Sequence, residues 1–196
     1  MKGEVPVQTI QCAEAIVEVY EHFVKKVRIP KSYRVKELDD QIRTRRTKME
    51  VKTISEARKG GVPTPILYNI SDHEITMERI EGEALRDVLN DQLCEGVGEV
   101  VGKLHNCGIV HSDLTTSNMI HSGDKIYLID FGLSYFDQSL EARGVDIHLL
   151  FQTLKSTHDK PEELRYAFEV GYRSAFSKAD EVLKRVGEIE QRGRYL

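Results

Sequence analysis

The sequence predicts an α+β protein of two lobes: a small antiparallel-sheet lobe with one long helix over residues 1–82, and a reduced helical lobe over residues 83–196. Three observations predict this organisation. Short segments rich in β-branched residues fill much of the first lobe, a long charged helix interrupts them, and apolar residues at helical spacing dominate the second half. A chain of 196 residues suits one large domain or two small lobes.

The first lobe begins with three segments in which apolar and polar residues partly alternate, as expected for strands with one buried face. These segments are residues 5–10, 15–20 and 22–27. A hairpin over residues 65–70 and 74–79 is expected to complete the sheet, because the intervening Ser, Asp and His favour a turn.

A long helix is predicted over residues 37–59, ending at Gly60 and Gly61. Its apolar residues are few and stand among many charges at roughly helical spacing. We expect them to form one narrow buried stripe, made of Leu38, Ile42, Met49 and Ile54.

The second lobe begins with a helix over residues 93–107, whose apolar residues recur at the spacing of a buried helical face. Two short strands follow, at 119–121 and 125–129. Asp159 is predicted to cap a later helix that has Pro161 and Glu162 in its first turn. That helix is expected to continue over Leu164, Phe168, Gly171 and Ala175, and the remaining helices are expected over residues 145–154 and 179–191.

The composition excludes several classes of protein. With 40% hydrophobic and 31% charged residues, the chain is neither collagen-like, nor of low complexity, nor largely disordered. No apolar run approaches the ~20 residues that span a bilayer, so we expect a cytoplasmic protein without membrane contact. Cys12, Cys94 and Cys107 form no Cys-x-x-Cys pair, which argues against a disulfide framework or a cysteine zinc site.

Two carboxylates and an amide stand where phosphoryl transfer needs them. His111, Asp113 and Asn118 follow the spacing H-x-D-x4-N, and Asp130 opens an Asp-Phe-Gly sequence twelve positions later. The chemistry requires one carboxylate to orient the attacking oxygen, and an Asn and a second Asp to hold Mg²⁺ on the phosphates of ATP. In this order the two motifs resemble those of the protein kinase superfamily. The resemblance implies a kinase-like fold, with Asp113 as the catalytic carboxylate and Asn118 and Asp130 as metal ligands.

The same mechanism requires a Lys on the third strand that grips the phosphates and an acidic partner on the following helix. Lys25 and Lys26 end the third predicted strand, and Glu50 lies on the long helix beside Met49. We expect Lys26 to pair with Glu50. Lys25 stays an alternative, because alternation does not choose between adjacent residues.

Structural roles compete with catalytic ones at several positions. Asp113 and Asn118 favour turns, although their joint spacing with the Asp-Phe-Gly sequence argues for catalysis. We interpret His111 as packing the loop against Phe131. Asp146 is interpreted as a buried acceptor for the backbone of that loop, with a plain helix N-cap as the alternative.

The predicted nucleotide pocket combines a hinge with a phosphate loop. Residues 78–82 form the expected hinge between the lobes, with Glu78 and Ile80 beside the adenine and Met77 facing either the pocket or the core. The phosphate loop is assigned to Gln11, Cys12, Ala13, Glu14 and Ala15. It contains no glycine, and Cys12 occupies the place where related kinases commonly have one.

A closer resemblance extends over nearly the whole chain. The residues from Lys26 to Arg34, the helix with Glu50, the segment from Gly61 to Pro65, the segment from Gly108 to Asn118, and the tail from Arg192 to Tyr195 are similar to the small atypical kinases of the KEOPS (EKC) complex, in their free-standing archaeal form. The resemblance implies an ATP- and Mg²⁺-dependent serine/threonine kinase or ATPase. It also implies a Kae-type threonylcarbamoyltransferase and other KEOPS subunits as partners, in forming N6-threonylcarbamoyladenosine on tRNA.

Two alternatives stay open: an independent RIO-like kinase, and a pseudokinase scaffold that binds nucleotide without turnover. Only residues 133–145 separate the Asp-Phe-Gly sequence from the helix of Asp146, which leaves no room for a peptide-binding platform. The phosphate acceptor is therefore water, the protein itself or a partner.

The charge is unevenly distributed. The net charge is −4, yet residues 25–52 contain 11 Lys or Arg against 4 Asp or Glu. A solvated helix face is the simplest interpretation of this segment. Our hypothesis is that its cations attract tRNA phosphates or an acidic partner, with tRNA reached through the assembled complex. The cations concerned are Lys31, Arg34, Arg43, Arg45 and Arg46.

Overall fold

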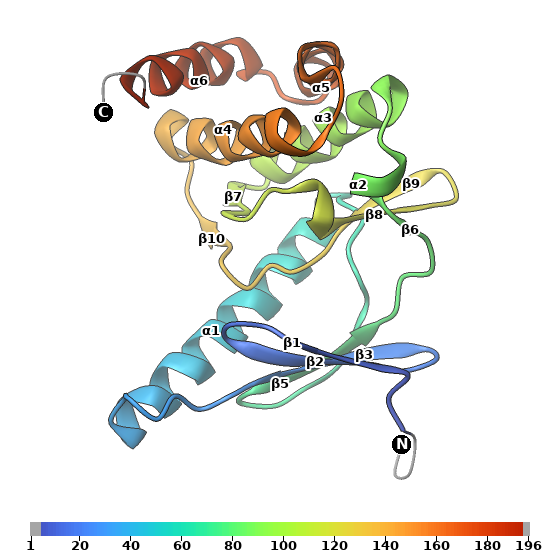
Figure 1. Ribbon diagram of the computed structural model, residues 1–196. Coiled ribbons are helices and arrows are strands. Elements are labelled where there is room, and N and C mark those ends of the chain that lie inside the picture. Colours follow the sequence, from blue (N-terminus) through green and yellow to red (C-terminus); the bar gives the residue numbers. More distant parts are fainter. Residues whose placement is uncertain (1–4, 194–196) are drawn as a thin grey trace.

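The computed structural model describes residues 5–193 and shows an antiparallel sheet in one half of the molecule and a group of helices in the other (Figure 1). The five strands of the sheet lie in the order β1-β2-β3-β5-β4, and each neighbouring pair is antiparallel. The three predicted strands and the hairpin are thereby confirmed. The strands are β1 (Gln8–Gln11), β2 (Ala15–Val19), β3 (Phe23–Arg28), β4 (Leu67–Ile70) and β5 (Glu74–Glu78).

The long helix α1 (Lys36–Lys59) runs from beside the sheet to the helical half (Figure 1). Its predicted apolar stripe is wrong, because Leu38 is exposed and only Ile54 of the four residues is buried. The face that α1 buries is mostly polar, since its threonine hydroxyls bond to backbone carbonyls of the same helix and Glu50 is held by cations of β3. The buried residues of α1 are Asp39, Thr47, Glu50, Thr53, Ile54 and Ala57.

Short strands join the two halves. The chain leaves β5 and enters β6, which pairs with the hairpin predicted around Gly123. The segment after the Asp-Phe-Gly sequence forms β10, which pairs antiparallel with β7, so it is a short strand rather than a free loop. Two-residue strands are too short to show a period in sequence. These elements are β6 (Glu83–Ala84), α2 (Leu85–Val88), β7 (Ile109–Val110), the 3-10 helix η1 (Thr116–Asn118), β8 (Met119–Ser122), β9 (Lys125–Leu128) and β10 (Tyr135–Phe136).

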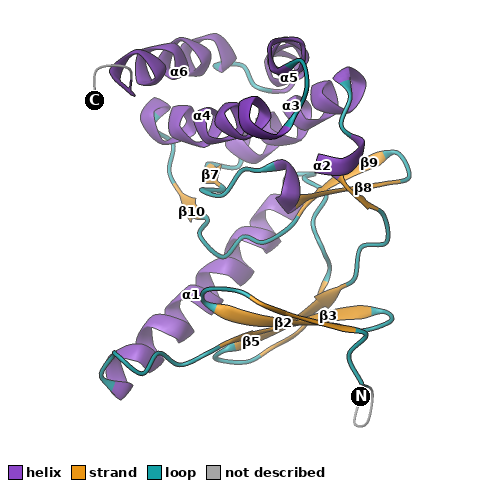
Figure 2. Ribbon diagram, viewed as in Figure 1, coloured by secondary structure: helices purple, strands orange, loops and turns teal. Residues whose placement is uncertain are grey.

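Four helices make up the other half (Figure 2): α3 (Asp91–Asn106), α4 (Leu140–Thr157), α5 (Pro161–Ala175) and α6 (Ala179–Gly193). Helix α4 begins five residues before its predicted start, because the Ser139 side chain accepts a hydrogen bond from the Ala142 N–H and caps it. The predicted Asp159 cap is wrong. Pro161 takes the first helical position, so the cap is the preceding Lys160, at φ 54°.

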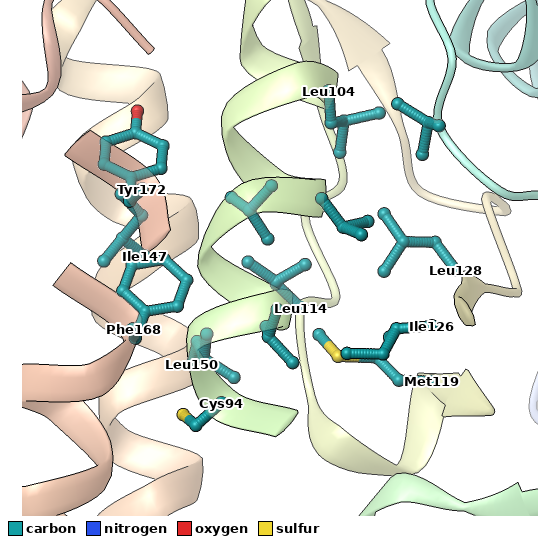
Figure 3. Packing of buried hydrophobic residues seen from close by; sticks show 14 of the residues in the cluster. Cys94, Leu104, Leu114, Met119, Ile126, Leu128, Ile147, Leu150, Phe168 and Tyr172 are labelled. Atoms are coloured by element: carbon teal, nitrogen blue, oxygen red, sulfur yellow. The ribbon is translucent and has the colours of Figure 1, made fainter. Parts of the chain in front are cut away.

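Helices α3 and α5 pack closely because glycines lie at their crossing. A Cβ on Gly98 would lie 2.1 Å from the Phe168 carbonyl oxygen, and one on Gly171 would lie 1.9 Å from the Glu95 carbonyl oxygen. In Figure 3, α3 lies between Phe168 and Tyr172 on one side and residues such as Leu128 on the other. Helix α3 is therefore the centre of the core.

The largest buried apolar cluster is not confined to the helical half. Ile54 and Ala57 of α1 and Val62 after it belong to the same cluster as the side chains of α3, α4 and α5. The last turns of α1 thus pack into the core of the helices. Among the described helices, none is long and apolar enough to cross a membrane.

Candidate active site

The two adjacent lysines of β3 lie on opposite faces of the sheet, so only one of them can face Glu50. Lys26 is only 8% exposed, and its Nζ lies 2.6 Å from Glu50 Oε1. Lys25 instead forms an ion pair of 3.0 Å with Glu74, partly exposed to solvent. The structure therefore brings together the expected partners, Lys26 and Glu50.

Asp130 completes a group of charges around the same ammonium. Its Oδ1 lies 2.7 Å from Lys26 Nζ and accepts the N–H of Gly132 at 3.2 Å. Burial by itself raises the pKa of Asp130, but the Lys26 ammonium and the Gly132 N–H outweigh it and hold that pKa below its ordinary value. Asp130 has φ 58°, a left-handed conformation that non-glycine residues rarely adopt and that is common at functional sites.

Asp113 and Asn118 are joined directly. Asn118 Nδ2 donates to the Asp113 carbonyl oxygen at 2.9 Å and to Asp113 Oδ2 at 2.8 Å. The 3-10 turn η1 brings the two residues together across the four that separate them. Because the Asn118 amide nitrogen is engaged, its amide oxygen is the atom left to act as a ligand.

Asp146 of α4 anchors the loop that carries Asp113. Asp146 accepts the backbone N–H groups of His111 and Ser112, each at 2.8 Å, and lies 3.3 Å from the ring nitrogen Nε2 of His105. Burial raises the pKa of Asp146, yet His105 and these N–H groups together lower it below its ordinary value. The interpretation of Asp146 as a buried acceptor is confirmed.

His111 packs as predicted. Its ring centroid lies 4.9 Å from that of Phe131, and its Nε2 lies 3.1 Å from the Ile129 carbonyl oxygen. Both contacts tie the Asp113 loop to the strand that leads into the Asp-Phe-Gly sequence.

A cavity of about 360 Å³ lies where the sheet faces the C-terminal half. Side chains of β1, β2 and β3 line it from the sheet, and Asn118 and Asp130 line it from the other half. Eight residues expected at the site line the cavity: Cys12, Lys26, Glu50, Met77, Glu78, Ile80, Asn118 and Asp130.

Comparison with known proteins assigns the chain to a family. A family model described as "RIO domain" matches residues 8–152. The chain belongs to the RIO domain family. Relatives of this RIO domain include a "Probable serine/threonine-protein kinase BUD32 homolog" of Archaeoglobus fulgidus, 50% identical over 93% of each chain. A "Probable bifunctional tRNA threonylcarbamoyladenosine biosynthesis protein" of Methanocorpusculum labreanum is 53% identical over 94% of this chain and 35% of its own length. This RIO domain thus spans about a third of that relative.

Solved structures support the fold alone. The Rio2 kinase of Chaetomium thermophilum is similar with a TM-score of 0.67 at 12% identity, covering 98% of this chain and 73% of that one. The aminoglycoside phosphotransferase APH(2'')-Ib, solved with ADP, has a TM-score of 0.60 at 15% identity, covering 95% and 92%. The kinase-like fold of two lobes is thereby confirmed.

The glycine-free loop of this RIO domain is tied back toward the start of α1. Glu14 pairs with Arg46 at 2.7 Å and with Arg34 at 3.7 Å, and Lys31 donates to the Ala13 carbonyl oxygen. Gln11, Ala13, Glu14 and Ala15 do not line the cavity, whereas Cys12 does. Ala15 is buried in the sheet.

The residues at the cavity fit a metal that arrives with a nucleotide. Mg²⁺ binds through one or two protein oxygens, substrate phosphates and water. The Asn118 amide oxygen and the Asp130 carboxylate are the two protein oxygens on offer. No described group of three or more His, Cys, Asp or Glu could hold a metal without such help.

Two residues that the sequence left unassigned support the site. Arg28, two residues after Lys26 and so on the same face of β3, binds Glu50 Oε2. Ser134 lies beside α1, with its hydroxyl 2.6 Å from that of Thr53. Alternation could have revealed Arg28. Nothing local could have revealed a contact between residues 53 and 134.

Thr53→Val is expected to lower the free energy of unfolding by about 1 kcal/mol, because the buried Ser134 hydroxyl loses one of its two hydrogen-bond partners. Thr47→Val is the matched control, since the buried Thr47 hydroxyl bonds, within the described residues, to the Arg43 carbonyl oxygen of its own helix. Urea denaturation of both variants measures the difference. Equal losses would show that the link between α1 and the Asp-Phe-Gly segment adds nothing to stability.

Proposed function

We propose that this RIO domain transfers the γ-phosphoryl group of ATP, as an ATPase or a serine-directed atypical kinase, within an assembly that forms N6-threonylcarbamoyladenosine on tRNA. The observation that carries the proposal is that Lys26, Glu50, Asn118 and Asp130 line one cavity, while Asp113 is joined to Asn118 by a hydrogen bond. The name of the Methanocorpusculum labreanum relative supplies the tRNA context, and that of the Archaeoglobus fulgidus relative supplies the kinase.

Each residue has a distinct task in this mechanism. Lys26, oriented by Glu50, contacts the phosphates of ATP. Asn118 and Asp130 would hold Mg²⁺, which neutralises the charge of the transferred group. Asp113 orients the attacking oxygen and accepts its proton. In this mechanism the rate acceleration comes from positioning and charge neutralisation, so it depends on how rigidly these groups are held.

The acceptor in this proposal is water or a residue of a partner. Ser134 is only 4% exposed and bonds to Thr53 and to the Phe131 carbonyl oxygen, so its hydroxyl is not free to attack. Ser139 uses its oxygen to cap α4. The pairing of β10 with β7 leaves the segment after Gly132 without the open surface on which a peptide would lie.

The Kae-type transferase and other KEOPS subunits are the proposed partners. We propose that the basic tail, residues 192–196, reaches the transferase, as the resemblance of this tail to the KEOPS kinases suggests. Arg194, Tyr195 and Leu196 lie outside the described residues.

The experiment follows γ-labelled ATP with the purified chain alone, with the transferase, and with transferase plus tRNA. Release of labelled inorganic phosphate supports the ATPase, and label on a serine of the partner supports the kinase. Label on a serine of the chain itself would show that the proposed acceptor is wrong. Efficient labelling of unrelated free proteins would favour an independent kinase. No turnover under any condition, together with binding of ADP, would leave a nucleotide-binding scaffold.

The cations available to tRNA differ from those that the sequence suggested. Arg34 and Arg46 pair with Glu14, Arg43 pairs with Asp39, and Lys31 binds a carbonyl of the phosphate loop. Of the five predicted cations, Arg45 alone forms no ion pair or hydrogen bond with the described part of the chain.

Two lysines join Arg45 on the exposed face of α1 to form a basic stripe, defined as Arg45, Lys48 and Lys52. The stripe borders a shallow surface groove of about 460 Å³, with Asp40 at one end. Lys52 lies 5.0 Å above the ring of Phe136, which is itself partly exposed. Cations beside an exposed aromatic ring suit a nucleic-acid backbone with a stacked base. We assign the tRNA contact of this subunit to the basic stripe.

Replacing all three stripe residues by Gln is expected to weaken tRNA binding by the assembled complex about tenfold and to make its salt dependence shallower. Each lost phosphate contact lowers the slope of log K against log salt by about 0.7–0.9. Replacing Lys103, Lys125 and Lys155, exposed lysines of the C-terminal half, is the matched control. Binding assays across salt concentrations decide, and an unchanged slope in the stripe variant would exclude this surface.

A further inference from the structure

Arg28 is a buried cation to which the mechanism above gives no task. It is 4% exposed and follows Lys26 by two residues on β3, so both side chains project from the same face of the strand. Its Nη2 binds Glu50 Oε2, while Lys26 Nζ binds Glu50 Oε1. A single carboxylate of α1 is thus held by two cations of one strand, one on each oxygen.

Arg28 lies behind the site rather than in it. It is absent from the residues that line the cavity, and its Nε has no hydrogen-bond partner in the described chain. The Asp-Phe-Gly segment covers it closely: a Cβ on Gly132 would lie 3.1 Å from Lys26 Nζ and 3.6 Å from Arg28 Nη2. Any influence of Arg28 on a nucleotide in the cavity would therefore pass through its neighbours.

The charges show what Arg28 changes. Without it, Lys26 would face the carboxylates of Glu50 and Asp130 as their only cation, and a phosphate would meet a site of net negative charge. With Arg28 on Glu50, the two cations and the two carboxylates balance before the nucleotide arrives. A guanidinium is also planar and rigid, so it orients a carboxylate more closely than an ammonium does.

We propose that Arg28 is a positioning residue, which orients Glu50 and through it Lys26 for phosphate contact. It also holds α1 at one place against β3. The Thr53–Ser134 contact holds the next turn of α1 to the Asp-Phe-Gly segment, so the helix is tied at two successive turns. The inference rests on the proposed phosphoryl transfer.

The test compares ATP turnover by Arg28→Met, Arg28→Lys, Glu50→Gln and the double variant Arg28→Met/Glu50→Gln. Arg28→Met is expected to lower kcat about 30-fold with KM for ATP within about threefold, because it disturbs positioning rather than contact. Arg28→Lys, which keeps the charge, is expected to recover kcat to within about fivefold of the wild type. In the Glu50→Gln background, Arg28→Met should lower kcat further by less than about threefold, because its effect passes through Glu50.

Lys25→Met is the matched control, because Lys25 also forms an ion pair on β3 but on the opposite face. Its kcat should stay within about twofold of the wild type. Equal and additive losses in both backgrounds, with no recovery by Arg28→Lys, would show a merely structural role and overturn the inference. So would an unchanged kcat in Arg28→Met.

The proposed function can fail separately. If the wild type shows no ATP turnover that depends on Asp113, both proposals are wrong. If the wild type shows such turnover and Arg28→Met has the same kcat, only this inference is wrong. If circular dichroism shows that Arg28→Met is unfolded, the comparison is made between Glu50→Gln and the double variant. The double variant removes both the Arg28 cation and the Glu50 carboxylate, so it leaves neither charge buried without its partner. A further large loss of kcat in that double variant would then overturn the inference.

Discussion

Asp113→Asn is expected to lower kcat for ATP turnover by about 10²–10⁴, the range for losing a positioned general base. The substitution keeps the size of the side chain and leaves an oxygen for the hydrogen bond from Asn118. It removes the group that accepts the proton of the attacking oxygen. Binding of ADP with Mg²⁺ should therefore stay within about threefold of the wild type, as measured by calorimetry.

The control for this variant is Asp124→Asn, which makes the same chemical change at an exposed turn between β8 and β9. We expect its kcat to equal that of the wild type. If Asp113→Asn turned ATP over as fast as Asp124→Asn, the assignment of Asp113 as the catalytic carboxylate would be wrong.

Asp146→Asn is expected to lower the free energy of unfolding by about 3 kcal/mol. Both carboxylate oxygens accept buried N–H groups, so an amide would turn its own NH₂ toward one of these donors. Denaturant unfolding at neutral pH measures the loss. Asp180→Asn is the control, because the Asp180 side chain is 84% exposed and, within residues 5–193, its ion pair is with Arg173; its effect should stay within about 0.5 kcal/mol.

The loss in Asp146→Asn should depend on pH in a defined direction. The pKa of Asp146 lies below its ordinary value of 3.8, so the folded state favours the carboxylate. That stabilisation is fully present above pH 3.8 and disappears as the pH falls through the lower pKa of the folded state. The gap between wild type and variant should therefore narrow in acid. A gap of constant size would show that the charge of Asp146 contributes nothing.

The sequence was a good guide to groups that a single spacing rule connects. Asp113, Asn118 and Asp130 lie in short motifs whose geometry follows from one loop and one strand. In the structure Asn118 and Asp130 line one cavity, and Asp113 is hydrogen-bonded to Asn118. The expectation of Lys26 was correct, but alternation alone left Lys25 open, because the choice depends on which face of β3 meets α1. That face is set by tertiary packing rather than by alternation.

The sequence was a poor guide where burial is polar. The pattern predicts an apolar inner face for α1 with Glu50 beside it, but Thr47 and Thr53 are also buried there, because each finds a hydrogen-bond partner. The Asp159 cap failed for a different reason: a favourable cap residue loses its place when Pro161 occupies the first helical position. In both cases a neighbouring residue decided the outcome: a hydrogen-bond partner for the buried threonines, and Pro161 for the cap. A pattern of residue types along the chain does not identify such a partner.

The shared apolar core has a consequence for how the protein unfolds. Since Ile54, Ala57 and Val62 belong to the cluster built around α3, α1 cannot separate from the other helices without exposing that cluster. We therefore expect α1 to unfold together with the helices, in one transition, despite the outline of two lobes. A nucleotide bound between the two halves would raise the stability of this unit, because it binds the folded state.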